Sequence, residues 1–280
     1  MNANRVIYYE DPLNDDFAGN HIKPRRVGRN FRFIRRSCLW RIPAFLLYYL
    51  IAIPLVFLIS KIYLGVRIEN RGVMKKAGKK GCFLYLNHTQ YLDAFIPPLV
   101  AFPKKAYTVA NADAVSLPGL GWLVQMLGGL PVPNERGGLP GFIAAVEQRF
   151  RQGNVVSIYP EAHIWPFYTG IRPFRSTSFR YPAKLQCAVF TAVTTYRKRR
   201  GLFFWIRRPG MTIRIEGPFY PEHGLPVKAA AADLRDRVYR QMCKTCGREG
   251  NICYIRYVQR GKETTDDDID EGALCAAGND

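Results

Sequence analysis

A histidine and an aspartate five positions apart are the first candidates for chemistry in this sequence. The apolar run 82–86 ends in Asn87 and His88, and Asp93 follows. A straight helix would turn His88 and Asp93 about 140° apart, so they can meet only across a turn. A carboxylate that accepts the Nδ1 proton leaves Nε2 free as a general base. The alternative interpretation is a loop histidine followed by an aspartate that caps the next helix.

A second apolar run also ends in polar groups. Residues 155–159 lead into Pro160, Glu161 and His163, and Arg172 and Arg175 follow downstream. If both runs are parallel strands, their carboxyl ends meet at one edge of the sheet, where ligands bind in α/β folds. The two arginines could then supply an anion site. Alternatively, Glu161 is an acidic residue at a helix N-terminus or a hinge residue that hydrogen-bonds backbone groups, and the arginines face solvent or lipid.

The elements that must position these residues alternate between strand and helix patterns. This alternation predicts an α/β fold, with a single mixed-sheet domain flanked by helices over residues 65–262. The strand patterns fall at 66–70, 82–86, 105–109, 130–132, 155–159, 188–196 and 211–217, and the helix patterns at 93–101, 118–127, 141–151 and 229–243.

The charge of the chain indicates an anionic partner. There are 41 Lys and Arg against 22 Asp and Glu, which gives a net charge of +19. Such a balance favours binding to a membrane surface, a nucleic acid or a phosphorylated ligand. Residues 1–41 form a polar and then basic N-terminal arm, and residues 263–280 are expected to be an acidic disordered tail. The seven scattered cysteines fit a reducing, cytosol-facing location.

An uncharged apolar segment lies between two basic regions. Residues 42–59 contain no charged side chain, and as a helix they would be about 27 Å long, at the lower limit for crossing a bilayer. Pro54 should kink this helix. Basic residues on both flanks favour a membrane-associated helix over residues 42–64 that dips into, or lies along, the cytoplasmic leaflet. A full span and a buried core helix are the alternatives.

The order of these features resembles a known superfamily. A membrane helix is followed by a strand with Asn-His-x4-Asp, then Gly-Gly-Leu-Pro-Val, then a strand with Tyr-Pro-Glu, then a basic and aromatic run. Over residues 40–220 this order resembles the lysophospholipid/glycerolipid acyltransferases, those similar to 1-acyl-glycerol-3-phosphate acyltransferases. The resemblance implies transfer of an acyl chain from acyl-CoA or acyl carrier protein to a hydroxyl of a membrane lipid.

The resemblance also implies roles for individual residues. His88 would be the general base, Asp93 would orient it, and Glu161 would help to bind the acceptor. The thioester is reactive enough that no metal is required, and neither a cofactor nor a nucleic-acid partner is expected. Amides near Asn87 or in the Gly128–Gly129 turn are candidates for stabilising the oxyanion. The substrate-binding candidates are Asn87, Arg136, Glu161, His163, Arg172 and Arg175.

The sequence departs from the family pattern around the acceptor. The third block is typically Phe-Pro-Glu-Gly-Thr-Arg, whereas here residues 159–164 read Tyr-Pro-Glu-Ala-His-Ile. The arginine of the second block falls on Asn134, with Arg136 two residues on, and the proline-containing fourth block is absent. The resemblance therefore supports acyl transfer but not a lysophosphatidate acceptor. Arg172 or Arg175 could replace the lost guanidinium, or the acceptor could lack a phosphate there.

Two other functions compete with acyl transfer. His88, Asp93, Glu161 and His163 have the side chains of a zinc or manganese site in a metal-dependent hydrolase. The basic arm could instead belong to a non-catalytic membrane or nucleic-acid adaptor.

Overall fold

A seven-stranded mixed sheet forms the centre of the molecule, as expected from the strand–helix alternation. The computed structural model describes residues 5–17, 19, 23–116, 119–201 and 203–261. The strand order is β2-β8-β7-β3-β6-β4-β5, and only the β7–β8 pair is antiparallel. The strands of this sheet are β2 (Arg67–Glu69), β3 (Cys82–Leu86), β4 (Ala106–Ala110), β5 (Gly129–Pro131), β6 (Val155–Ile158), β7 (Val189–Arg197) and β8 (Gly210–Phe219).

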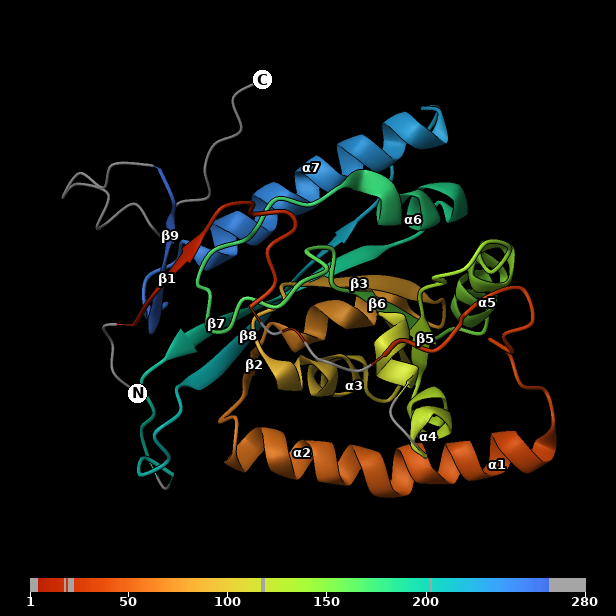
Figure 1. Ribbon diagram of the computed structural model, residues 1–280, viewed down its shortest axis with the longest axis horizontal. Helices are drawn as coiled ribbons and strands as arrows, with labels where there is room; N and C mark the ends of the chain where they lie inside the picture. Colours follow the sequence, from red (N-terminus) through yellow and green to blue (C-terminus); the bar gives the residue numbers. More distant parts are fainter. Residues whose placement is uncertain (1–4, 18, 20–22, 117–118, 202, 262–280) are drawn as a thin grey trace.

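Helices cover both faces of this sheet (Figure 1). Every residue of β3 is buried, and alternate side chains enter two different cores. Phe83 and Tyr85 pack in a cluster with residues of the helices on one face, and Leu84 and Leu86 pack with α3 on the other. The helices are α3 (Ile96–Ala101), α4 (Gly121–Met126), α5 (Leu139–Arg151), α6 (Arg180–Leu185) and α7 (Val227–Cys246).

The apolar segment is one helix of 25 residues, Cys38–Ile62. It consists of α1 (Cys38–Leu46), a π-helical stretch (Leu47–Ala52) and α2 (Ile53–Ile62). Pro54 lies in the first turn of α2. Because proline has no N–H and its ring crowds the preceding turn, a wider π turn before it relieves the clash. Where a kink was expected at Pro54, the structure has a π-helical stretch shortly before it.

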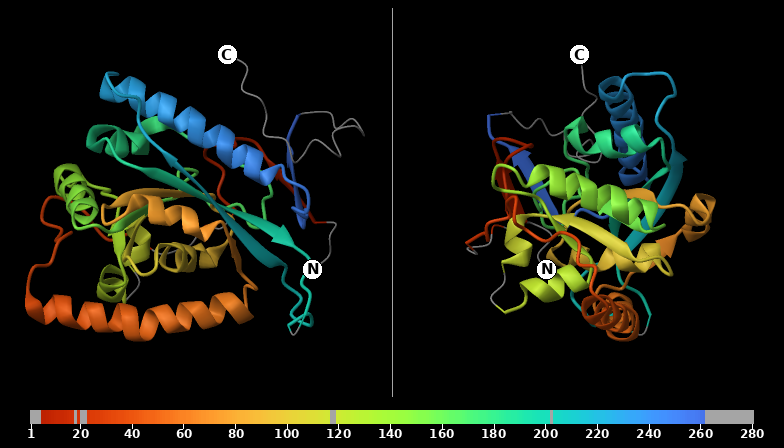
Figure 2. Two further views of the ribbon diagram at one scale, coloured as in Figure 1. Left: turned by 180° about the vertical axis from the view of Figure 1, so that it is seen from behind. Right: turned by 90° about the vertical axis from the view of Figure 1, so that its right-hand side faces the viewer.

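This helix lies along one edge of the molecule (Figure 2). Its buried residues, Ala44, Tyr48, Val56 and Ser60, form one narrow stripe. The Tyr48 hydroxyl accepts the backbone N–H of Ala106 at 3.0 Å, so the stripe packs against the α/β domain. The apolar side chains around the rest of the helix are exposed, among them Leu39, Ile42, Phe45, Leu46, Leu50, Ile51, Leu55, Phe57 and Leu58.

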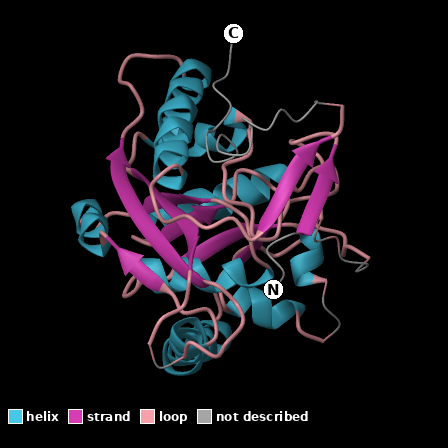
Figure 3. Cartoon of the chain, turned by 90° about the vertical axis from the view of Figure 1, so that its left-hand side faces the viewer, coloured by secondary structure: helices cyan, strands magenta, loops and turns pink. Residues whose placement is uncertain are grey.

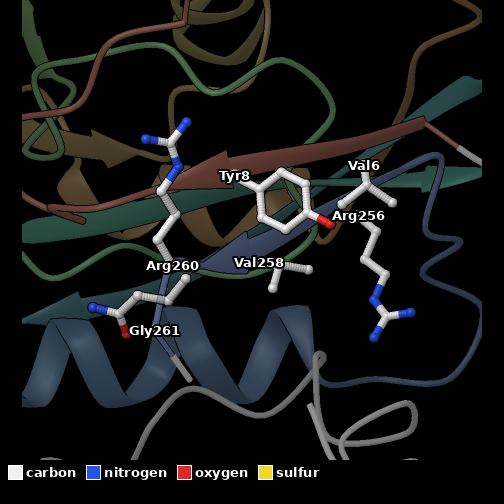
Figure 4. Close-up of a pocket in the computed structure, with 7 residues that line it drawn as sticks. Val6, Tyr8, Arg256, Val258, Arg260 and Gly261 are labelled. Atoms are coloured by element: carbon white, nitrogen blue, oxygen red, sulfur yellow. The ribbon is translucent and has the colours of Figure 1, made fainter. Parts of the chain in front are cut away.

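A second, two-stranded sheet joins the two ends of the described chain. β1 (Arg5–Tyr9) pairs in parallel with β9 (Ile255–Gln259), separately from the large sheet (Figure 3). The N-terminal stretch, expected from the sequence only as a polar arm, therefore contains a strand. A hollow lies over the small sheet, and Tyr8, Arg256 and Arg260 are among the residues that line it (Figure 4). None of the predicted site residues lines this hollow. The predicted acidic tail lies outside the described residues.

Candidate active site

His88 and Asp93 meet across the turn that follows β3. His88 Nδ1 lies 3.0 Å from Asp93 Oδ2, and the same oxygen accepts the backbone N–H groups of Thr89 at 2.7 Å and Gln90 at 2.9 Å. The Asp93 side chain is 1% exposed, and that of His88 is 18% exposed. The aspartate thus combines both roles considered from the sequence, because it caps the following helical turn and binds the imidazole.

Two further contacts fix this turn in the fold. The Tyr159 hydroxyl donates to the backbone oxygen of Asp93 at 2.7 Å, and its ring packs on the His88 ring with 4.4 Å between centroids. The Asn87 side chain donates to the Thr194 carbonyl at 3.0 Å and accepts the Thr194 N–H at 2.8 Å. Asn87 therefore joins the end of β3 to β7 and holds the adjacent His88 in place.

Glu161 and Arg172 form a buried pair beneath the histidine turn. Glu161 accepts the backbone N–H of His88 at 3.1 Å and that of Arg172 at 3.0 Å. The Arg172 guanidinium lies 3.7 Å from Glu161 Oε2 and donates to the carbonyls of Glu161 and His163. Burial raises the pKa of Glu161, while Arg172 and the two amides act in the opposite direction. Glu161 thus hydrogen-bonds backbone groups, as in the hinge alternative.

The other substrate-binding candidates lie in different surroundings. The His163 ring is partly exposed, with Nδ1 3.5 Å from an Asp16 carboxylate oxygen. Arg175 and Arg136 are exposed, whereas Arg172 is 1% exposed. Arg172 could reach an acceptor phosphate only after its loop rearranged. Arg175 and Arg136 are the predicted arginines whose side chains face solvent.

The backbone amides around His88 already have partners. The amide of His88 donates to Glu161, and those of Thr89 and Gln90 donate to Asp93. The amide of Gly128 donates to the Gln125 carbonyl at 3.2 Å. These groups were candidates for stabilising an oxyanion, and in this conformation they are occupied.

The four possible metal ligands do not converge. Over the described ranges, no group of three or more His, Cys, Asp or Glu side chains could hold a metal ion. Both oxygens of Glu161 accept backbone N–H groups, and His163 points to Asp16 instead of His88. The ligand set of the hydrolase alternative is therefore not assembled.

A polar network on the other side of the turn was not predicted from the sequence. The buried Tyr196 hydroxyl lies 2.7 Å from Thr89 Oγ1 and accepts from Gln90 Nε2 at 3.1 Å. Arg208 donates to Gln90 Oε1 at 3.0 Å and to the Tyr63 hydroxyl at 2.7 Å. Arg208 thus connects the histidine turn to the end of the apolar helix. No short motif signals this network, because its members are far apart in sequence.

A comparison with protein-family models agrees with the class that this site suggests. Residues 65–195 match the family model described as Acyltransferase. That stretch is an acyltransferase domain, and the resemblance stated from the motifs is confirmed.

The chain is also similar to a solved structure, 1-acyl-sn-glycerophosphate (LPA) acyltransferase, PlsC, from Thermotoga maritima. The identity is 13% and the TM-score 0.48, over 74% of this chain and 87% of that chain. No curated protein sequence matches the chain.

Proposed function

We propose that this protein transfers an acyl chain from acyl-CoA or acyl carrier protein to a hydroxyl of a glycerolipid or a related membrane acceptor. The observation that carries the proposal is the 3.0 Å contact between His88 Nδ1 and Asp93 Oδ2. Asp93 Oδ2 also accepts two backbone N–H groups, so it faces His88 as a hydrogen-bond acceptor. The Nδ1 atom must then carry the proton, and Nε2 is left with a free lone pair.

The reaction follows from this tautomer. His88 Nε2 takes the proton of the acceptor hydroxyl while its oxygen attacks the thioester carbonyl carbon. The resulting imidazolium is stabilised by the Asp93 carboxylate. When the C–S bond breaks, the leaving sulfur takes the proton back from Nε2. The products are an oxygen ester and a free thiol, and the histidine returns to its starting state.

We also propose that the Cys38–Ile62 helix holds the protein in the plane of the membrane, on the cytoplasmic face. Its inner stripe packs along the α/β domain, and Lys105 Nζ lies 4.5 Å from the Tyr48 ring centroid. A helix that crossed the bilayer would carry this charged domain surface into the hydrocarbon, which is costly. Its exposed apolar side chains and the net charge of +19 instead suit the interface of an anionic leaflet.

The acceptor in this proposal is a lipid hydroxyl, with or without a phosphate group nearby. Ile164 stands where the family pattern has arginine, and Arg172 is engaged with Glu161. If the acceptor carries a phosphate, the exposed Arg175 or Arg136 would be the predicted side chain to meet it. Their substitution by glutamine should then raise the KM for the acceptor while kcat is retained.

The direct test is to identify the product. Purified protein in detergent–lipid micelles is incubated with radiolabelled acyl-CoA, or with labelled acyl carrier protein, and a panel of acceptors. The panel contains lysophosphatidate, other lysophospholipids, glycerol phosphate and neutral long-chain alcohols. A labelled ester with one acceptor class, together with one thiol released per ester, supports the proposal. Hydrolysis alone, with labelled fatty acid as the only product, would contradict it.

A further inference from the structure

The connection between β7 and β8 combines basic and aromatic residues, and apart from Arg208 the candidate active site does not use them. Residues 198–209 read Lys-Arg-Arg-Gly-Leu-Phe-Phe-Trp-Ile-Arg-Arg-Pro, and no acidic residue occurs from Arg197 to Arg214. We call residues 198–201 and 203–209 the β7–β8 tip. Its apolar centre is bordered by cationic side chains on both sides, which is the composition of segments that bind membrane interfaces.

Two of the three aromatic side chains of the β7–β8 tip are exposed to solvent, whereas Phe203 is half-buried. Phe204 is 71% exposed and Trp205 is 60% exposed. Their ring centroids lie 5.9 Å apart, and Phe203 lies 5.6 Å from Trp205. A cluster of exposed large aromatic rings is unfavourable in water and marks an interaction site. Tryptophan is the residue that most favours the headgroup level of a bilayer.

The β7–β8 tip is joined to the end of the apolar helix. Arg199 donates through Nη1 to the Ile62 carbonyl at 2.9 Å and through Nη2 to the Tyr63 carbonyl. The Arg208 guanidinium lies 4.9 Å from the Tyr63 ring centroid. The views in Figures 1 and 2 place the tip and the helix at the same edge of the molecule. A flat surface that contacts the exposed side of the helix would therefore also reach the tip.

The same tip lies next to the candidate catalytic turn. β7 runs parallel to β3, so the tip after β7 and the His88 turn after β3 emerge at one edge of the sheet. Arg208 donates to the side-chain oxygen Oε1 of Gln90 at 3.0 Å, and the backbone N–H of Gln90 donates to Asp93 Oδ2. Contact between the tip and a membrane would thus bring the histidine turn to the surface where a lipid acceptor resides.

We propose that the β7–β8 tip is a second membrane-binding element, with Phe204 and Trp205 inserted at the headgroup level and the flanking cations on anionic lipids. The partner of the tip is an anionic phospholipid bilayer. The run of positive charge selects an anionic surface, and the edge that the tip shares with the apolar helix selects a bilayer. The proposal rests on the proposed membrane association of the helix. It does not require that acyl transfer be the reaction.

Insertion of Trp205 is tested by fluorescence quenching, which needs no activity. The full chain is reconstituted with phosphatidylcholine–phosphatidylglycerol vesicles in which the acyl chains are brominated near the headgroup. Because Trp205→Phe keeps an aromatic ring in the tip, the other tryptophans stay in the same environment. The difference in quenching between wild type and W205F therefore reports Trp205 alone. A clear loss of the quenched component in W205F is expected, and equal quenching in both proteins would overturn the proposal.

The role of the cations is tested by vesicle flotation. Each basic residue near an anionic surface contributes roughly fivefold in affinity, so the double variant Arg200→Gln/Arg207→Gln should bind anionic vesicles roughly 25-fold more weakly. The matched control is Lys228→Gln/Lys244→Gln, which removes the same charge from exposed positions of α7. Binding to pure phosphatidylcholine should change little. Equal losses in the two double variants would contradict a specific role for the tip.

Activity separates this proposal from the proposed function. With an acceptor presented in anionic vesicles, Phe204→Ser/Trp205→Ser should lower turnover, while a short-chain acceptor in free solution should be used as by wild type. Tyr220→Ser is the control, because Tyr220 is 49% exposed and follows β8, which ends at the opposite edge of the sheet. If wild type transfers no acyl chain but Trp205 is quenched, the proposed reaction fails and the membrane-binding tip stands.

Discussion

The hydrogen bonds of Asp93 predict an unusually mild effect for the substitution Asp93→Asn. All three donors around this side chain, His88 Nδ1 and two backbone amides, approach the single atom Oδ2. Oδ1 has no hydrogen-bond partner among the described residues. In the variant, the amide oxygen must occupy the Oδ2 position, since an NH2 group there would face two N–H donors. The asparagine therefore still accepts the Nδ1 proton, and the histidine keeps its tautomer.

The expected loss of activity in Asp93→Asn follows only from removal of the negative charge of the Asp93 side chain. A hydrogen bond to a charged group contributes about 1.5–3 kcal/mol and one to a neutral group about 0.5–1.5 kcal/mol. The imidazolium formed during transfer thus loses about 1–2 kcal/mol of stabilisation, which lowers kcat about 5- to 30-fold. In serine proteases the corresponding change costs about 10⁴-fold, because there the histidine adopts the wrong tautomer.

The assay is thiol release from saturating acyl-CoA with the acceptor found in the product analysis. Circular dichroism and thermal unfolding of each variant verify the fold, and Asp236→Asn on the exposed side of α7 is the control for a change of one charge. A loss of about 10⁴-fold in folded Asp93→Asn would refute the inferred proton position. Full activity would show that the carboxylate charge does not contribute.

Three further predictions concern stability. Arg172→Met should lower the free energy of unfolding by about 3–5 kcal/mol, because it leaves Glu161 as an unpaired buried charge. A stable variant in which only the KM for the acceptor is raised would assign Arg172 to substrate binding instead. Ala162 has φ +64° and is exposed, so Ala162→Gly should stabilise by about 0.5–1 kcal/mol in urea unfolding, whereas Ala229→Gly in α7 should destabilise. Burial lowers the pKa of Lys105 to about 8, so between pH 8 and 10.5 the unfolded chain holds a proton at Lys105 that the folded chain does not. The free energy of unfolding, measured relative to Lys105→Gln, should therefore rise by up to about 3 kcal/mol as the pH increases over that window. A difference between the two proteins that stays constant with pH would contradict this prediction.

The elements of the large sheet were predictable because their apolar runs are short and bounded by turns. The runs at 82–86 and 155–159 correspond to β3 and β6 within one residue, and the polar groups that follow them meet at one sheet edge. The helix patterns at 141–151 and 229–243 correspond to α5 and α7, which extend slightly further at their ends. Helix ends depend on tertiary packing, which explains this difference.

The features that could not be predicted from the sequence depend on contacts between segments that are distant along the chain. β1 was not predicted, because its pairing with β9 joins opposite ends of the chain and leaves no local pattern. Burial of Arg172 could not be predicted either, since a basic side chain in a loop is normally solvated. The glycine-to-alanine departure at Ala162 becomes interpretable only with its positive φ, a conformation that favours glycine.

The turnover of His88→Ala with the identified acyl donor and acceptor tests the role of His88 as general base. We expect a loss of about 10²- to 10⁴-fold in kcat, which is the contribution of a positioned general base, with an unchanged unfolding transition. His223→Ala, an exposed histidine, should retain full activity. Acyl transfer by folded His88→Ala at the wild-type rate would contradict the assignment of His88 as the base.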